Sequence, residues 1–127
     1  MFRILITDDL SPQSLERLKA AEDANFDMVH RPSLERLREI IPSYDALIIR
    51  SSVEVGADLL EAASQLKVIG RAGVGLDNVD IDAASLRGVI VMNTPGANTI
   101  ATAEHAMAML LALCRHVPQA DASTRVG

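Results

Sequence analysis

Residues 46–70, ALIIRSSVEVGADLLEAASQLKVIG, contain two short apolar runs separated by a segment with a helical pattern. The runs Ala46–Arg50 and Lys67–Gly70 have the length of strands, whereas Ala57–Ser64 repeats apolar side chains every three or four positions. Both runs are almost continuous in Ile, Leu and Val, which is typical of parallel strands that are covered on both faces. The stretch therefore predicts a strand, a helix and a second, parallel strand.

The same alternation extends to either side of this stretch. Three further strands are predicted at Arg3–Thr7, Phe26–His30 and Val89–Asn93, and three further helices at Ser11–Ala21, Ser33–Ile41 and Asp82–Leu86. Right-handed crossovers in such a chain produce a doubly wound parallel sheet with helices on both faces. The sequence thus predicts an α/β fold with five strands, and a ligand crevice at the carboxyl ends of those strands.

A long helix is predicted after the last strand, from Thr99 to His116, and it ends before Pro118. A five-stranded unit that is complete at Asn93 has little use for a helix of about 27 Å. The tail Gln119–Gly127 is polar and is expected to bury little. We therefore expect the chain to be the amino-terminal piece of a longer protein, cut soon after a second domain begins.

Composition restricts the class of protein. Hydrophobic residues make up 49% and charged residues 23% of the chain, which is the balance of an ordinary globular protein. A net charge of -5 and only three scattered aromatic residues argue against nucleic acid as a partner. The longest apolar stretch, 106–114, is too short to span a membrane. Cys114, the single cysteine, is predicted to be buried and fits a reducing, cytoplasmic compartment.

Asp8 and Asp9 follow the first strand, where response-regulator receiver domains hold Mg²⁺. A receiver also needs a phosphate-accepting Asp after the third strand and a Lys after the fifth. This sequence has Arg50 and Asn93 at those places. The receiver is therefore a minor alternative, no metal site is predicted, and the acidic pair is interpreted as a turn and helix-cap feature.

Arg50, Ser51 and Ser52 follow the third strand and bring one guanidinium and two hydroxyl groups to the expected crevice. Such donors suit a carboxylate or a phosphate. The alternative is a surface arginine that pairs with Glu54.

Three glycines lie within the segment Gly70–Asp80, GRAGVGLDNVD, which follows the fourth strand. Glycines at this place indicate backbone that approaches a ligand closely and leaves N–H groups free to hold an anion. The order of residues from Gly73 is G-x-G-x-x-N, and Asp77 would repel a pyrophosphate, so this is not a dinucleotide loop. A tight turn without a ligand remains the alternative.

The segment after the fifth strand, NTPGANTIATAEH, leads into the long helix. Pro95 keeps the preceding residue extended, and Asn98 lies at the positive end of the helix, as a cap or as a ligand contact. His105 has no carboxylate placed opposite it by any motif, so we do not assign it a catalytic role.

Together, Arg50-Ser51, GRAGVGLDNVD and NTPGANTIATAEH resemble the D-isomer-specific 2-hydroxyacid dehydrogenases over essentially the whole chain. The resemblance is greatest to the members that oxidise 3-phosphoglycerate to 3-phosphohydroxypyruvate in serine biosynthesis. It implies an NAD-dependent enzyme with a flavodoxin-like substrate domain, residues 1–97, and a Rossmann domain that the long helix begins, residues 98–127. Sibling enzymes that reduce glyoxylate or hydroxypyruvate, and a non-catalytic binding module, remain alternatives.

The resemblance also implies roles for individual residues. Arg50, Ser51 and Arg71 would bind a phosphorylated hydroxy or keto acid, the N–H groups of Val74 and Gly75 would hold its carboxylate, and Asn98 would lie near substrate and nicotinamide. The family's catalytic Arg, Glu and His and its nucleotide loop are not among these residues. The chain alone is therefore expected to be inactive and to bind NAD poorly, and a homo-oligomer through the Thr99–His116 region is expected.

Overall fold

The computed structural model describes all 127 residues, which divide into two compact units, Met1–Pro95 and Gly96–Gly127. The first unit contains β1 (Phe2–Ile6), α1 (Pro12–Lys19), β2 (Ala24–Met28), α2 (Leu34–Ile40), a 3-10 turn (Ile41–Ser43), β3 (Ala46–Ile49), α3 (Ala57–Ala62), β4 (Val68–Arg71), α4 (Ile81–Leu86) and β5 (Ile90–Met92). The second contains α5 (Thr99–Cys114) and α6 (Val117–Val126).

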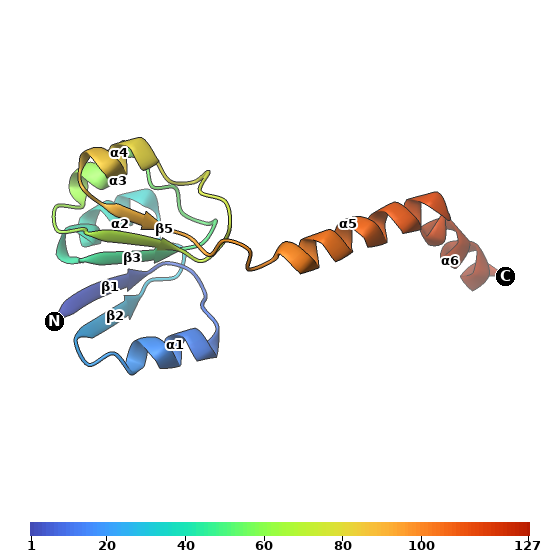
Figure 1. Ribbon diagram of the computed structural model, residues 1–127, viewed down its shortest axis with the longest axis horizontal. Coiled ribbons are helices and arrows are strands. Elements are labelled where there is room, and N and C mark those ends of the chain that lie inside the picture. The colour runs from blue at the N-terminus through green and yellow to red at the C-terminus, as the bar shows by residue number, and fades with distance from the viewer. The chain divides into compact units, whose positions relative to one another are not determined.

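The first unit is built on a five-stranded sheet in the order β2-β1-β3-β4-β5, and every pair of neighbouring strands is parallel. Helix α1 lies on one side of the sheet, and α2, α3 and α4 lie on the other (Figure 1). The predicted doubly wound α/β fold is confirmed. The strand order is that of flavodoxin-like sheets, in which ligands bind beyond the carboxyl ends of the strands.

Strand boundaries differ from the predicted ones by one or two residues. The largest shift is in β2, which begins at Ala24 instead of Phe26 because Phe2 pairs with Ala24 in the parallel register. Strand β3 ends at Ile49, and Arg50 donates its N–H to the Asp8 carboxylate at 2.8 Å instead of to a neighbouring strand. Backbone pairing with the neighbouring strand, and not hydrophobicity, therefore sets these ends.

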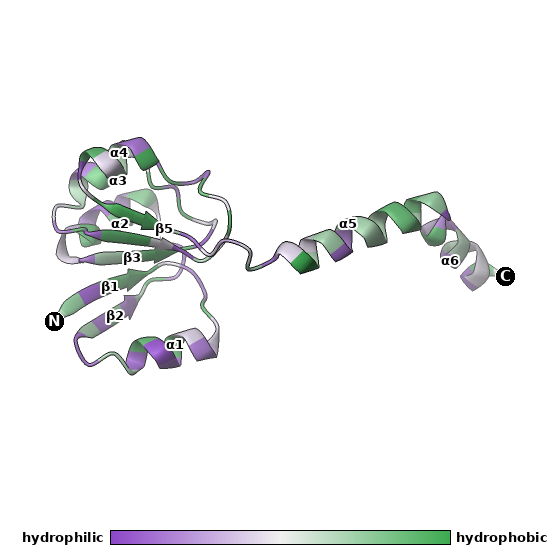
Figure 2. Ribbon diagram, viewed as in Figure 1, coloured by the Kyte–Doolittle hydropathy of each residue, from purple (hydrophilic) through white to green (hydrophobic).

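The hydrophobic core lies between the sheet and the side that carries α2, α3 and α4. Leu47, Ile49 and Ile69 of the central strands are fully buried there, together with Leu59 and Leu60 of α3. The opposite face is covered only in part, because Ile90 and Met92 of β5 are 63% and 59% exposed. Strand β5 is hydrophobic along its length (Figure 2).

Three helices of the first unit have side-chain caps at their N-termini. Ser11 accepts a hydrogen bond from the Ser14 N–H at 3.2 Å, and Pro12 occupies the first turn of α1 as predicted. Ser33 caps α2 through the Arg36 N–H, and Asp80 caps α4 through the Ala83 N–H at 2.9 Å. Each cap satisfies a donor that the helix itself leaves free.

The second unit contains one helix that was not predicted and corrects one prediction. The polar tail is helical, because α6 covers Val117–Val126 and accommodates Pro118 in its first turn, where its missing N–H costs nothing. His116, with φ of 50°, separates it from α5. Cys114 is exposed and not buried, because α5 buries none of its residues. The helix is nevertheless apolar on most sides (Figure 2). No helix of the chain has the length and apolar character needed to cross a membrane.

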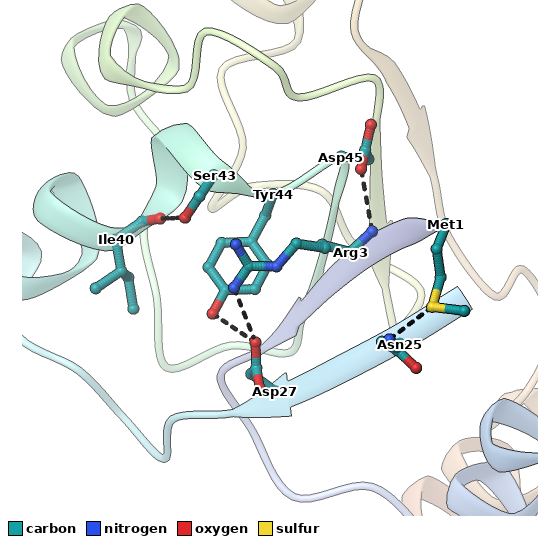
Figure 3. Close-up of polar contacts among 8 residues, drawn as sticks. All are labelled: Met1, Arg3, Asn25, Asp27, Ile40, Ser43, Tyr44 and Asp45. Atoms are coloured by element: carbon teal, nitrogen blue, oxygen red, sulfur yellow. Dashed lines mark hydrogen bonds and ion pairs between the residues drawn. The ribbon is translucent and has the colours of Figure 1, made fainter. Parts of the chain in front are cut away.

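A polar cluster holds the amino-terminal edge of the sheet together (Figure 3). The Tyr44 hydroxyl donates to the Asp27 carboxylate at 2.8 Å, and Arg3 pairs with the same carboxylate at 3.3 Å. Burial, and then the hydrogen bond to Asp27, raise the pKa of Tyr44. Asp45 accepts from Lys67 Nζ at 2.7 Å and from the Arg3 N–H at 3.0 Å, and these bonds lower its pKa below the ordinary 3.8.

The Asp45 contacts predict an acid-dependent loss of stability. A carboxyl group whose pKa is lower in the folded state stabilises the fold above its ordinary pKa, and that contribution disappears as the pH falls below 3.8. We expect Asp45→Asn to be less stable than the wild type at pH 6, with the difference shrinking below pH 4. Urea unfolding of the wild type and of Asp45→Asn across this pH range measures the difference in stability. Glu22→Gln, at an exposed residue, is the matched control, and a difference independent of pH would contradict the prediction.

Candidate functional site

The carboxyl ends of β3 and β4 bring the two candidate arginines to one edge of the sheet. Ile49 of β3 pairs with Arg71 of β4, and Arg50 is the next residue after Ile49. The two strands are direct neighbours in the sheet. Two arginines, 21 residues apart in the sequence, therefore stand at adjacent positions along the carboxyl edge of the sheet.

The backbone of Arg50 is held from both sides. The Asp8 carboxylate accepts from the Arg50 N–H at 2.8 Å and from the Ser52 hydroxyl at 2.6 Å. The carbonyl oxygen of Arg50 accepts from the side-chain amide of Asn78 at 2.8 Å. The Arg50 side chain itself is exposed and forms no hydrogen bond or ion pair, so the alternative pairing with Glu54 is not formed. Ser51 is exposed beside it.

The acidic pair after β1 corrects a further prediction. Asp8 is buried, and both of its carboxylate oxygens accept hydrogen bonds from the loop after β3, across more than 40 residues of sequence. Asp9 is exposed and contacts His30 at 3.3 Å. Neither residue caps α1, since Ser11 does so. The expected turn and cap role was wrong because a contact distant in sequence captures Asp8.

The glycine loop after β4 presents two free N–H groups on one side. The Gly73 carbonyl accepts from the Thr94 N–H at 3.0 Å, and the Val74 carbonyl accepts from Asn93 Nδ2 at 2.7 Å. All peptide bonds are trans, so the N–H of Val74 and that of Gly75 point away from these carbonyl partners. Neither N–H donates a hydrogen bond within the chain. Two neighbouring N–H groups are therefore available to an anion.

Arg71 folds back over the glycine loop. Its Nε donates to Asn78 Oδ1 at 3.0 Å. A Cβ placed on Gly73 would overlap Nη1 of Arg71, and a Cβ on Gly75 would lie 3.9 Å from the same atom. The missing side chains of these two glycines thus make room for the guanidinium, which lies beside the free N–H groups of Val74 and Gly75.

Two shallow hollows lie next to this loop and differ in charge. One, of about 290 Å³, is lined by Glu54, Val55, Gly56, Asp77, Asn78, Val79 and Asp80. The other, of about 270 Å³, is lined by Ile48, Gly70, Arg71, Ala72, Met92, Asn93 and Thr94. Three carboxylates in the first would repel an anion, whereas the second contains a guanidinium and no carboxylate. An anionic ligand is therefore expected on the side of the second hollow.

Asn98 belongs to the second unit and begins α5. Its φ and ψ are −123° and 12°, and its side chain makes no capping hydrogen bond, although its carbonyl accepts from the Thr102 N–H at 2.8 Å. Of the six candidate residues, the first unit thus gathers Arg50, Ser51, Arg71, Val74 and Gly75 at one sheet edge. Of the two roles left open for Asn98, a cap or a ligand contact, the side-chain cap is not formed.

Sequence reasoning missed two asparagines. Asn78 contacts Arg71, Arg50 and Val53, and Asn93 contacts Val74. Asn78 lies in the segment GRAGVGLDNVD and Asn93 in NTPGANTIATAEH, both of which the sequence analysis considered. No sequence pattern, however, indicates which groups the side chain of a loop asparagine will contact. Asn93 follows a strand end, which is the one signal that favours a position at this edge.

Comparison with known proteins identifies the family of this chain. The model for the catalytic domain of D-isomer specific 2-hydroxyacid dehydrogenases matches residues 4–125. The chain belongs to this family. A D-3-phosphoglycerate dehydrogenase of Archaeoglobus fulgidus is 42% identical over 125 residues, and one of Mycobacterium bovis is 47% identical over 122 residues. The alignments cover 98% and 96% of this chain, which spans about a quarter of the relatives' own length (24% and 23%).

A solved structure supports the fold. The crystal structure of an NAD+-bound 3-phosphoglycerate dehydrogenase from Entamoeba histolytica matches 87% of this chain with a TM-score of 0.76 and 26% identity. The match covers 38% of that protein. The α/β fold of this chain is therefore that of its 2-hydroxyacid dehydrogenase neighbours among solved structures.

Proposed function

We propose that the chain is the amino-terminal, substrate-binding part of an NAD-dependent D-3-phosphoglycerate dehydrogenase. The full enzyme would oxidise 3-phosphoglycerate to 3-phosphohydroxypyruvate, a step of serine biosynthesis, in the cytoplasm. The observation that carries this proposal is the guanidinium of Arg71 beside two free backbone N–H groups. The names of the relatives that match nearly the whole chain support the choice of substrate.

The site offers two kinds of anion binding within one sheet edge. The N–H groups of Val74 and Gly75 suit the substrate carboxylate, because neighbouring backbone donors can share its two oxygens. The guanidinium groups of Arg50 and Arg71, with the hydroxyl of Ser51, suit the phosphate. A three-carbon acid with an anion at each end would be held at both ends, with its middle carbon left accessible for oxidation.

The residues of this chain do not fit a nicotinamide dinucleotide. The glycine loop lacks the G-x-G-x-x-G order, and its carbonyls are held by Asn93 and Thr94. When bound to the full enzyme, NAD would accept the hydride from the substrate. In this proposal residues 1–97 bind and orient the substrate, and residues 98–127 begin the cofactor domain, with Asn98 near the nicotinamide.

The proposal also defines what the 127 residues do not do. The catalytic Arg, Glu and His that the resemblance implies are not among them, so no residue here is assigned to move the substrate's proton. We expect the isolated chain to show no turnover of NADH with phosphohydroxypyruvate. Measurable turnover would contradict this expectation.

The experiment that tests the function uses the full-length enzyme that contains these residues. NADH formation is followed with 3-phosphoglycerate, D-glycerate and glycolate as substrates. We expect kcat/KM to be highest for 3-phosphoglycerate. A preference for an unphosphorylated acid would indicate a sibling glyoxylate or hydroxypyruvate reductase, and activity with none of them would overturn the proposal.

The Thr99–His116 region is proposed to join two copies of the chain. Helix α5 leaves the apolar side chains Ile100, Met107, Met109, Leu110, Leu111 and Leu113 more than half exposed. A patch of this kind is usually covered by another protein surface. Sedimentation of the full-length enzyme should therefore show a species larger than the monomer, and a monomer at micromolar concentration would refute this assembly.

A further inference from the structure

We propose that Asn78 is a positioning residue of the anion site: one side-chain amide fixes the guanidinium of Arg71 and at the same time holds the backbone of Arg50. The role in substrate binding rests on the function proposed above, whereas the positioning itself rests on geometry. Neither the glycine pattern nor the strand ends assign Asn78 a role, so the inference comes from the contacts alone.

The side chain of Asn78 uses both its donors and its acceptor. Nδ2 donates to the carbonyl oxygens of Arg50 at 2.8 Å and of Val53 at 2.7 Å. Oδ1 accepts from Arg71 Nε at 3.0 Å. The opposite orientation of the amide would face its oxygen toward two carbonyl oxygens, so the partners determine which atom is nitrogen.

No other small side chain can replace this set of bonds. Aspartate has acceptors only, so it would lose both bonds to carbonyl oxygens, and its charge would neutralise that of Arg71. Serine offers one donor and a shorter reach, and alanine offers nothing. The carboxamide is therefore required chemically, and not merely tolerated, at a point where two carbonyls and one guanidinium N–H converge.

Asn78 is itself fixed by its backbone. Its carbonyl accepts from the Val55 N–H at 2.8 Å, and the Asp80 N–H donates back to the Val55 carbonyl at 2.9 Å. Val55 and Val79 form an isolated parallel bridge, and both are buried. A side chain that projects from such an anchored backbone can hold a mobile arginine in one place.

The consequence for Arg71 is preorganisation. Nε is occupied by Asn78, which leaves Nη1 and Nη2 for a ligand beside the free N–H groups of Val74 and Gly75. A guanidinium that is already held in place loses less conformational freedom when the anion binds. Arg50 differs, because its backbone is fixed while its side chain stays free.

A double-mutant cycle in the full-length enzyme tests whether Asn78 acts through Arg71. We expect Asn78→Ala to raise KM for 3-phosphoglycerate about tenfold, with a smaller change in kcat, because the guanidinium loses its fixed place. In the Arg71→Ala background the same change should raise KM by about threefold or less. A larger factor in that background, or no effect in the wild type, overturns the inference. Asn78→Ser replaces the alanine variant if the latter does not fold.

Two further variants separate positioning from simple stability. Asn78→Asp should raise KM at least as much as Asn78→Ala, because its charge opposes that of the anion. Asp80→Ala removes the cap of α4, two residues away, and should lower the thermal midpoint without changing KM. If Asp80→Ala shifts KM as strongly as Asn78→Ala does, Asn78 acts only through stability and the inference is wrong.

A measurement on the 127-residue chain is independent of enzyme activity. In nitrogen-15 NMR spectra the Nε–H of Arg71 should exchange with water more slowly than that of Arg50, and Asn78→Ala should abolish this difference. Equal exchange in the wild type would overturn the positioning role. Protected exchange together with an inactive full-length enzyme would instead refute the proposed function and leave the positioning role standing.

Discussion

Replacement of Arg71 by alanine in the full-length enzyme is expected to raise KM for 3-phosphoglycerate by about 100-fold, the cost of losing a charge-assisted pair with a phosphate. The guanidinium lies over a loop that has no side chains to replace it, since Gly73 and Gly75 border it. Strand β4 contains no other cationic residue that could replace Arg71 beside this loop. Stability should change little, because the Arg71 side chain has one hydrogen-bond partner, Asn78.

The measurement compares two substrates. If Arg71 binds the phosphate, KM for 3-phosphoglycerate rises more than KM for D-glycerate in Arg71→Ala. Arg71→Lys keeps the charge but loses the planar fork and the bond from Nε, so it should recover only part of the affinity. Equal effects on both substrates would place Arg71 at the carboxylate and would favour a sibling reductase.

Gly73→Ala examines the same site without removing the arginine. Its new Cβ would overlap Nη1 of Arg71, which is the far end of a flexible side chain, so the guanidinium must move while the backbone stays. We expect an unfolding midpoint near that of the wild type and a KM for 3-phosphoglycerate raised in the same direction as in Arg71→Ala. An unchanged KM would mean that the position of the guanidinium over the loop has no part in binding.

Replacement of Asp8 by alanine is expected to lower the free energy of unfolding by about 2–3 kcal/mol. The Asp8 carboxylate is buried and accepts from the Arg50 N–H and from the Ser52 hydroxyl. Alanine leaves the part-buried N–H of Arg50 and the Ser52 hydroxyl without their shared partner, and such unmet donors cost more than the lost bonds themselves. Because this bond anchors the chain that carries Arg50, KM for the phosphorylated substrate should also rise.

The neighbouring acidic residue supplies the matched control for this prediction. Asp9 has a side chain that is 77% exposed and contacts only His30, so Asp9→Ala should change the free energy of unfolding by less than about 0.5 kcal/mol. Urea titrations of both variants measure the difference. Equal destabilisation by the two substitutions would show that the contacts of Asp8 with the loop after β3 contribute nothing.

Most of the architecture could be predicted because its signals are local. Short runs of Ile, Leu and Val separated by helical repeats specify strands and helices, and Ser11 with Pro12 specifies where α1 begins. The exact first and last residues of the strands could not be predicted, because a strand begins and ends where it pairs with its neighbour, as Phe2 does with Ala24. The helix α6 was missed because Pro118 was read as a stop, although in the first turn of a helix it is accepted.

The sequence by itself determined the parallel α/β sheet and the arrival of Arg50, Arg71 and the glycine loop at its carboxyl edge, because periodicity and strand ends are written along the chain. Only the tertiary structure decided that Asp8 and Asn78 hold the loop after β3, and that the guanidinium of Arg71 lies over Gly73. Hydrogen bonds between loops depend on which loops the sheet brings close together in space. The spacing of residues along the sequence does not give the distance between two loops in the folded chain.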